Sequence, residues 1–225
     1  MCSSDLCLTL LPTTISLAPS STVVTYGRVV TLTAQVGACV APCNVQIYKT
    51  PRNGARTLAA SGVADADGSY IVGLKPTKQT TYDAVFVGDD TYLHAASAPT
   101  RVNVAALVGI AATHRDATAS RYAVYDYTTS CTLRGVGCPT FVGSLAPHHG
   151  KQQLSFTVQR LTRRGWRSFV TARFPLNRRT GKVAIIWVYR TRGIIGRRYR
   201  IRSAYAGDRD LEAARSAWAY WRVRS

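Results

Sequence analysis

An internal repeat constrains this sequence more than any other feature. Phe86-Val-Gly-Asp89, followed by Ala95-Ala96-Ser97, matches Tyr205-Ala-Gly-Asp208, followed by Ala213-Ala214 and Ser216. Each copy continues into an alternating run, which is Val102-Asn-Val104 in the first and Trp221-Arg-Val223 in the second. Self-similarity of this kind is typical of tandem copies of one structural unit. The repeat therefore predicts two domains of the same fold within the 225 residues.

Short alternating segments fill the first copy. They are rich in Val, Ile, Thr and Tyr and are separated by Gly, Asp, Asn and Pro, which is the pattern of β-strands joined by turns. The predicted strands are Thr13–Ala18, Val29–Val36, Val45–Lys49, Arg56–Ala64, Ser69–Leu74, Thr80–Val87 and Pro99–Val104. Helical patterns are nearly absent, apart from a possible turn at Leu211–Arg215. Seven short strands favour an immunoglobulin-like β-sandwich, so we expect an all-β chain of two tandem immunoglobulin-like β-sandwiches.

The repeat also gives the expected domain boundaries. Domain 1 is expected at residues 13–105 and domain 2 at residues 106–225, with a longer loop region at 126–150 where the match to the first copy is weak. Residues 1–12 are set aside as an unreliable N-terminus, because residues 1–6 resemble the translation of a common sequencing adapter. No signal peptide is visible, and we expect that it was lost with the true N-terminus. No apolar run approaches the roughly 18 residues of a membrane span.

Charge is distributed unevenly between the two halves. Residues 1–105 contain 7 Lys or Arg and 6 Asp or Glu, whereas residues 106–225 contain 22 and 5. Nearly the whole formal net charge of +18 therefore lies in the second domain. Such asymmetry favours an anionic partner, for example a wall polymer, an acidic glycan, a nucleic acid or a lipid surface. The Arg-rich and Lys-poor composition is also typical of a GC-rich genome, which raises the arginine content without selection for binding.

Strand alternation gathers part of this charge on one predicted face. Successive side chains of a strand point to opposite faces, so Ile201, Ser203 and Tyr205 are expected to point inward with Trp221 and Val223. The outward set then contains arginines interleaved with aromatic residues, on two strands that are neighbours in an immunoglobulin-like sheet. The candidate ligand-binding residues are Arg198, Arg200, Arg202, Trp218, Tyr220, Arg222 and Arg224. A solvated or packing face is the structural alternative, because cross-strand Arg–aromatic pairs stabilise exposed sheets by themselves. Trp166 and Trp187 are expected in the core or at a sheet edge.

Six cysteines are present, and four of them form two close pairs. The spacing of Cys39 with Cys43, and of Cys131 with Cys138, predicts local disulfides that clamp loops, and hence an oxidising compartment. A metal site made of Cys131, Cys138, His148 and His149 is the alternative, but adjacent histidines rarely face one ion and the spacing fits no common zinc pattern. We therefore expect no metal and no cofactor.

Motifs for catalysis are missing from the sequence. It contains no Gly-x-Ser-x-Gly elbow, His-Glu-x-x-His pair or phosphate-binding loop. Asp65-Ala-Asp67-Gly68 resembles the start of a calcium loop, but the later ligands and the closing Glu are missing, so a hairpin turn is favoured. The five carboxylates of the second domain are a small supply for acid–base chemistry. The sequence therefore predicts that the protein is not an enzyme.

The repeat motif resembles a known family. Residues 81–97, with their Tyr-Asp-Ala-Val-Phe-Val-Gly-Asp-Asp core and a later Val-x-Val ending, are similar to the bacterial immunoglobulin-like repeats of secreted actinobacterial cell-surface proteins. In the second copy, residues 159–167 and 199–208 resemble the same family, and the likeness covers most of residues 13–105 and 151–225. The resemblance implies stalks, spacers or adhesive modules of exported proteins, and it implies fold more than ligand.

Two functions follow as expectations. The first is a non-catalytic, extracellular or cell-wall structural and adhesive protein, whose basic second domain contacts an anionic cell-wall polymer or polysaccharide. The second is a carbohydrate-binding accessory module of a secreted enzyme that is truncated here. Nucleic acid is the least favoured partner, and binding to it would weaken steeply with salt.

Overall fold

The computed structural model describes residues 10–129, 131, 138–189 and 191–225. The chain forms two compact units, one comprising residues up to Ala105 with Arg209–Leu211, the other comprising Ala106–Asp208 and Glu212–Ser225. Nearly all regular structure in the described residues is β-strand; η1 (Arg192–Ile194) is a single 3₁₀ turn. No helix long and apolar enough to cross a membrane occurs in these ranges.

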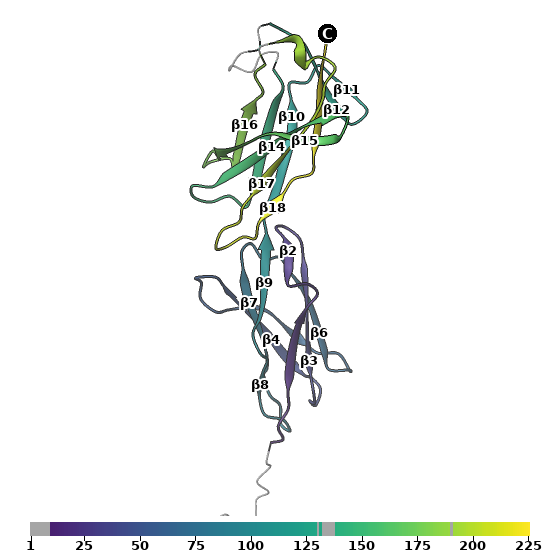
Figure 1. The fold of residues 1–225 in the computed structure, drawn as a ribbon. Coiled ribbons are helices and arrows are strands. Elements are labelled where there is room, and N and C mark those ends of the chain that lie inside the picture. The colour runs from purple at the N-terminus through teal and green to yellow at the C-terminus, as the bar shows by residue number, and fades with distance from the viewer. Residues whose placement is uncertain (1–9, 130, 132–137, 190) are drawn as a thin grey trace, which may run out of the picture. The chain divides into compact units, whose positions relative to one another are not determined.

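Two sheets face each other in the first unit (Figure 1). The smaller sheet has the order β1 (Ile15–Pro19), β3 (Val30–Val36) and β6 (Ser69–Leu74). The larger sheet has the order β2 (Val23–Thr25), β9 (Thr100–Ala105), β7 (Thr80–Phe86), β4 (Asn44–Pro51) and β5 (Thr57–Val63), with β8 (Ala95–Ala96) paired to β7. All strands pair antiparallel except β2, which runs parallel to β9.

The second unit repeats this topology and adds one edge strand, β11. Its smaller sheet has the order β10 (Leu107–Thr113), β13 (Thr140–Ala146) and β16 (Lys182–Ile186). Its larger sheet has the order β11 (Ala117–Ala119), β12 (Tyr122–Asp126), β19 (Ala219–Arg224), β17 (Arg198–Tyr205), β14 (Gln153–Thr162) and β15 (Gly165–Pro175), with β18 (Ala214–Arg215) on β17. Here β12 runs parallel to β19, as β2 runs parallel to β9 in the first unit. Both units are immunoglobulin-like β-sandwiches, and the predicted all-β fold class is confirmed.

The core of each sandwich lies between its two sheets. In the first unit, alternate residues Tyr82, Ala84 and Phe86 of β7 are buried and face the equally buried Leu32 and Ala34 of β3. Apolar residues at every second position of a strand bury one face of its sheet, which is the main source of stability in such a fold.

Aromatic side chains dominate the core of the second unit. Trp221 of β19 is fully buried and stacks on Tyr199 of β17, with ring centroids 4.5 Å apart. Phe141 from the opposite sheet contacts the same indole at 5.6 Å. Ser203 is also buried, and its hydroxyl is satisfied because it donates to the Gly109 carbonyl of β10 at 2.9 Å.

Several local expectations differ from the structure. The short strands β2 and β8 were not predicted, because two or three residues carry no measurable alternation. Strand β13 (Thr140–Ala146) lies inside the region 126–150 that was expected to be a loop. The strand was not predicted because prolines, which indicate turns, flank its alternating residues. The possible helical turn at Leu211–Arg215 is instead extended at its end, where Ala214–Arg215 forms β18.

Candidate binding face of the second unit

The outer face of the larger sheet carries the predicted arginines. Ile201, Ser203 and Tyr205 of β17 are buried, as are Trp221 and Val223 of β19, which is the register that the sequence predicts. The alternate residues point outward: Arg198 is exposed, and the remaining predicted residues on this face are partly exposed or exposed. The two strands are antiparallel neighbours, so their outward side chains form one surface. We call the outer side of β12, β19, β17, β14 and β15 the arginine face.

Arg200 occupies the centre of this face. Its guanidinium carbon lies 4.6 Å from the ring centroid of Trp166 and 4.2 Å from that of Trp218. Arg202, two residues along β17, lies 4.5 Å from the Trp218 ring. These distances fall within the range of cation–π attraction, which extends to roughly 6 Å. Guanidinium groups and indole rings therefore alternate along this part of the face, and we call this series the ladder. Its members, in order, are Trp166, Arg200, Trp218 and Arg202.

Tyrosines continue the ladder toward β12. Tyr220 meets Trp166 edge to face at 5.8 Å and Tyr122 at 5.7 Å. The guanidinium of Arg121 lies 4.2 Å from the centroid of the Tyr220 ring, and that of Arg198 lies 6.0 Å from Tyr122. Aromatic rings and guanidinium groups thus alternate across three strands of the sheet.

Strand register aligns one row of this face across five strands. Tyr122 lies opposite Tyr220, Tyr220 opposite Arg200, and Arg200 opposite Gln159. Gln159 lies in turn opposite Ser168 of β15 and donates to its hydroxyl at 3.3 Å. Within this row Tyr122 and Tyr220 meet edge to face, and hydrogen bonds connect Arg200, Gln159 and Ser168.

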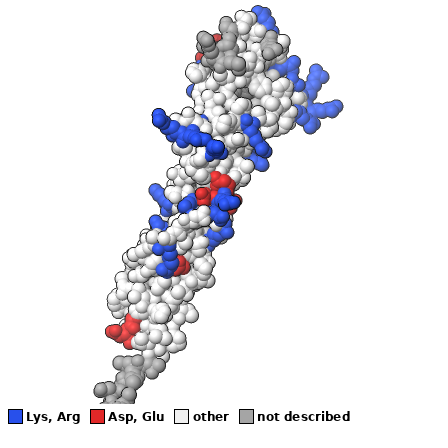
Figure 2. Space-filling model, turned by 90° about the vertical axis from the view of Figure 1, so that its left-hand side faces the viewer, with Lys and Arg blue, Asp and Glu red and all other residues white. Residues whose placement is uncertain are grey.

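Uncompensated positive charge distinguishes the face. In the described part of the chain, no ion pair or carboxylate hydrogen bond involves Arg121, Arg198, Arg200, Arg202 or Arg222. Burial lowers the pKa of Arg202 from its ordinary value, and the nearby charges of Arg215 and Arg200 lower it further. Lys and Arg side chains project from the second unit in the view of Figure 2. Crowded guanidinium groups of this kind attract anions.

Arg224 differs from the other predicted residues. Its Nε lies 2.5 Å from Oδ1 of Asp126 on the neighbouring strand β12. The hydrogen bond from Arg224 lowers the pKa of the Asp126 carboxyl below its ordinary value. The charge of Arg224 is therefore partly compensated within the domain, and we assign it to the edge of the face.

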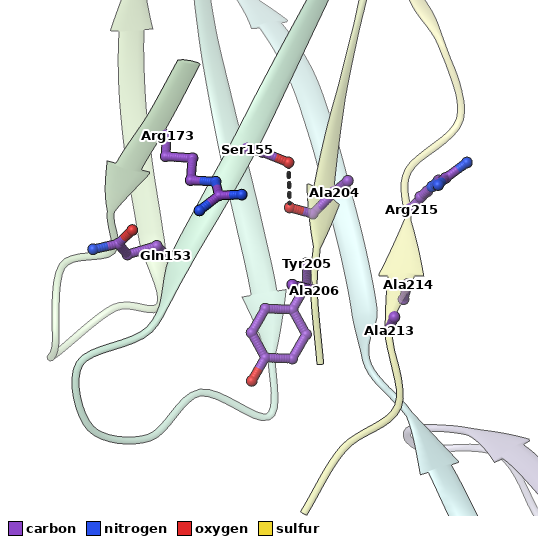
Figure 3. A pocket seen from close by; sticks show the side chains of 9 residues that line it. All are labelled: Gln153, Ser155, Arg173, Ala204, Tyr205, Ala206, Ala213, Ala214 and Arg215. Atoms are coloured by element: carbon purple, nitrogen blue, oxygen red, sulfur yellow. Dashed lines mark hydrogen bonds between the residues drawn. The ribbon is translucent and has the colours of Figure 1, made fainter. Parts of the chain in front are cut away.

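A shallow depression of about 650 Å³ lies at the Tyr205 end of β17, away from Arg198 (Figure 3). Alanines and Ser155 make up about half of its lining, and the hydroxyl of Ser155 donates to the Ala204 carbonyl at 3.2 Å. Arg173 extends from β15 toward Ser155, whereas Arg215 on β18 points away from the depression (Figure 3). These two arginines extend the charged surface beyond the residues predicted from the sequence.

The first unit does not carry the same surface. The positions equivalent to Arg198, Arg200 and Arg202 hold Gln79, Thr81 and Asp83. Asp83 accepts hydrogen bonds from Arg56, whose guanidinium also stacks on Tyr48 at 3.5 Å. The sandwich fold therefore does not require arginines at these positions.

Other predicted sites have structural roles. Cys39 is disulfide-bonded to Cys43, and Cys131 to Cys138, which leaves no free thiolate at these positions for a metal. At the calcium-like segment, Asp67 accepts a hydrogen bond from the Ser69 amide at 3.0 Å in a turn where Gly68 has φ +81°. The segment is a tight turn, but the predicted hairpin is wrong, because the turn joins β5 to β6 and these two strands lie in different sheets. No cluster of three metal-ligating side chains is found in the ranges that the structure describes.

Sequence reasoning missed part of the arginine face. Trp166 lies at the start of the edge strand β15, which confirms the edge alternative, but its ring contacts Arg200 on the arginine face, which the sequence did not predict. Arg121 and Tyr122 were not considered, because the repeat is weak in residues 106–150. Trp187, by contrast, contacts Trp221 and Tyr199 on the inner side, as one of the two assignments predicted.

Comparison with known proteins gives structural similarity alone. No family model and no curated protein sequence matches the chain. The chain is similar to the solved structure of a tetra-tandem repeat in the extending region of a large adhesion protein, with 14% identity, a TM-score of 0.40 and coverage of 94% of this chain and 49% of that one. It thus spans about half the length of that structure. It is also similar to the D0-D1 domain of intimin, with 15% identity, a TM-score of 0.31 and coverage of 92% and 97%.

Proposed function

We propose that this chain is a non-catalytic, exported structural or adhesive module, whose second domain binds an anionic cell-wall polymer or acidic glycan through the arginine face. The observation that carries the proposal is the outer surface of β17 and its neighbours, where arginines are held by aromatic rings instead of by carboxylates. Stacked guanidinium groups keep N–H donors at their edges, and these donors suit phosphate, sulfate or carboxylate groups.

Spacing along the face suits a polymer. Arg198, Arg200 and Arg202 occupy alternate positions of one strand, so they are separated by roughly 6.6–6.8 Å per step. Arg215 continues the line, because it lies opposite Ala204 at the next outward position. A linear chain with repeated negative charges would meet a donor at each step, and the weak contacts would add up through multivalency.

Stacking of a neutral sugar is the less favoured mode. A carbohydrate-binding module commonly presents free aromatic faces, but Arg200 and Arg202 both lie within 4.5 Å of the Trp218 ring. A sugar would have to displace these guanidinium groups before it could stack there. The contacts therefore favour a ligand that binds the arginines themselves.

Export is supported by the cysteines. Both disulfides close within single loops and need an oxidising compartment to persist. The sequence resemblance to immunoglobulin-like repeats of secreted bacterial proteins points in the same direction.

Co-sedimentation of the full chain with purified bacterial walls tests the proposal. The native protein and a variant carrying Arg173→Ser, Arg202→Ser and Arg215→Ser would be compared on walls before and after removal of their anionic polymers. A control variant with the same loss of charge carries Arg163→Ser, Arg178→Ser and Arg179→Ser. These three arginines lie exposed in turns. We expect loss of binding for the face variant and for stripped walls, and near-native binding for the control. Equal loss in both variants would mean that net charge alone drives binding, and absence of native binding would reject the proposal.

A further inference from the structure

A separate groove lies at the β12 end of the arginine face. It has a volume of about 610 Å³ and three elements contribute to it: the turn between β11 and β12, strand β17 and strand β19. Its lining residues are Ala119, Ser120, Arg121, Tyr122, Arg198 and Arg222. Three of the six are arginines, and the groove contains no acidic residue.

Two of these arginines lie directly opposite each other. Arg198 on β17 pairs with Arg222 on β19 in the antiparallel register. Side chains at such positions have Cβ atoms about 4.5–5.5 Å apart, and like charges placed there destabilise the sheet. Their guanidinium groups make no ion pair with any described residue. A bound anion would offset this repulsion and stabilise the sheet.

Arg222 has a second unusual feature. Its Nε atom is buried from solvent and has no hydrogen-bond partner. A buried donor without a partner costs free energy, and most such groups in folded proteins find an acceptor. An acceptor in the groove would offset the neighbouring guanidinium charges, and a rotation of the Arg222 side chain would bring its buried Nε–H to the same acceptor.

The third arginine is held in place by aromatic rings. Arg121 follows Ser120, whose backbone is in the left-handed region at φ 55°, a conformation that is uncommon for serine. The Arg121 guanidinium stacks on Tyr220 at 4.2 Å and approaches Tyr122 at 5.7 Å. The turn and the two rings therefore fix the position of the Arg121 guanidinium beside the groove.

We propose that this groove binds a tetrahedral oxyanion, a phosphate or sulfate ester group, between Arg121, Arg198 and Arg222. Three guanidinium groups from three elements offer donors in several directions, which suits the oxygens of a tetrahedral anion better than the two coplanar oxygens of a carboxylate. The inference rests on the proposed function, because it assigns the charged groups of the polymer and the place where one of them is held.

Titration with small anions tests the site without the polymer. The full chain, with arginine side chains labelled with ¹⁵N, would be titrated with glycerol 2-phosphate, methyl sulfate and acetate at constant ionic strength maintained with chloride. We expect saturable shifts of the Arg222 Nε–H signal with the phosphate ester, the sulfate ester or both, and at least 10-fold weaker binding of acetate. The stronger of the two esters identifies the source of the oxyanion. Linear, unsaturated shifts with both esters, or equal affinity for acetate, would overturn the inference.

Substitutions separate the site from general charge. Arg222→Gln should weaken ester binding by at least 10-fold, and Arg222→Lys, which keeps the charge but removes Nε, should weaken it by a similar factor. Arg163→Gln in an exposed turn should leave the affinity unchanged. Native tryptophan fluorescence would establish that each variant is folded. Native affinity in both Arg222 variants would overturn the inference.

The outcome is independent of the wall-binding experiment. Walls that are bound by a protein showing no saturable ester binding would remove this site and leave the proposed function in place. If the protein shows saturable ester binding but does not co-sediment with purified walls, the oxyanion site stands and the wall polymer is rejected as its ligand.

Discussion

Arg200 donates two hydrogen bonds to one oxygen of Gln159, from Nε at 2.9 Å and from Nη2 at 2.6 Å. The two residues lie opposite each other on β17 and β14. Because the guanidinium is also stacked between two indole rings, its plane and its direction are both fixed. The central arginine of the face is therefore held in one orientation, and the N–H donors that Gln159 does not use are left for a ligand.

Replacement of Arg200 by Lys tests how much this arrangement stabilises the second domain. Lysine keeps the charge but loses the planar stacking and the two-donor contact with Gln159, so we expect a loss of about 1–2 kcal/mol in the free energy of unfolding. Urea unfolding followed by tryptophan fluorescence would measure it, since all four tryptophans lie in the second half of the chain. The exposed Arg167 provides the control: Arg167→Lys should change stability by less than about 0.5 kcal/mol. If Arg200→Lys is as stable as Arg167→Lys, the ring and Gln159 contacts of Arg200 do not stabilise the domain.

The repeat explains which parts of this face could be predicted. Tyr205 and Trp221 align with Phe86 and Val102, and this alignment alone fixes the inward and outward positions of β17 and β19. The same alternation predicted most strands of the first unit to within a few residues. Local sequence pattern is sufficient where a strand is long enough to alternate and has a counterpart in the other copy.

Long-range pairing accounts for what could not be predicted. Tyr122 reaches the face only because β12 runs parallel to β19, about a hundred residues later in the sequence, and no pattern in residues 106–150 indicates that pairing. The neighbours of Trp166 depend in a similar way on the register of β14 with β15, which shifts by a bulge between Val158 and Gln159. A single-residue shift exchanges the two faces of a strand, so its outward residues are not determined by sequence alternation alone.

Phe86 tests the inward register of the first unit. Its side chain is fully buried, so Phe86→Ala should lower the free energy of unfolding by about 3–5 kcal/mol. The neighbouring Val85 points to the other face and is partly exposed, so Val85→Ala should cost far less. Urea unfolding followed by far-UV circular dichroism would compare the two. A neutral effect of Phe86→Ala would contradict the burial of this position.

Tyr125 should make the second unit sensitive to alkali. Burial raises the pKa of its phenol to about 12, from an ordinary value of about 10. Folding favours the neutral form, so this contribution to stability is complete below about pH 10 and is lost as the pH rises toward 12. The single hydroxyl proton is shared between the carbonyls of Thr113 at 3.0 Å and Thr140 at 3.3 Å. Tyr125→Phe should therefore cost about 0.5–1.5 kcal/mol at pH 7.

Burial also raises the pKa of Tyr82, Tyr189 and Tyr199, so the contribution of Tyr125 is measured as a difference between variants. Urea unfolding at a series of pH values should show a smaller loss of stability between pH 10 and 12 for Tyr125→Phe than for the native protein. Tyr26→Phe, in the first unit, serves as the matched control and should keep the native alkaline loss. An unchanged alkaline profile in Tyr125→Phe would place the sensitivity elsewhere.

Reduction of the disulfides should loosen two loops and leave both sandwiches folded. Cys39 and Cys43 are separated by 4 positions and Cys131 and Cys138 by 7, and neither bond links the two sheets directly. Rings of this size restrict the unfolded chain only modestly, so each bond should contribute roughly 2 kcal/mol. Far-UV circular dichroism with and without reductant should therefore show the same strand signal, with a lower unfolding midpoint. A Cys39→Ser, Cys43→Ser double variant should reproduce part of that shift without reductant, and collapse of the strand signal on reduction would mean that the hydrophobic cores do not hold the fold alone.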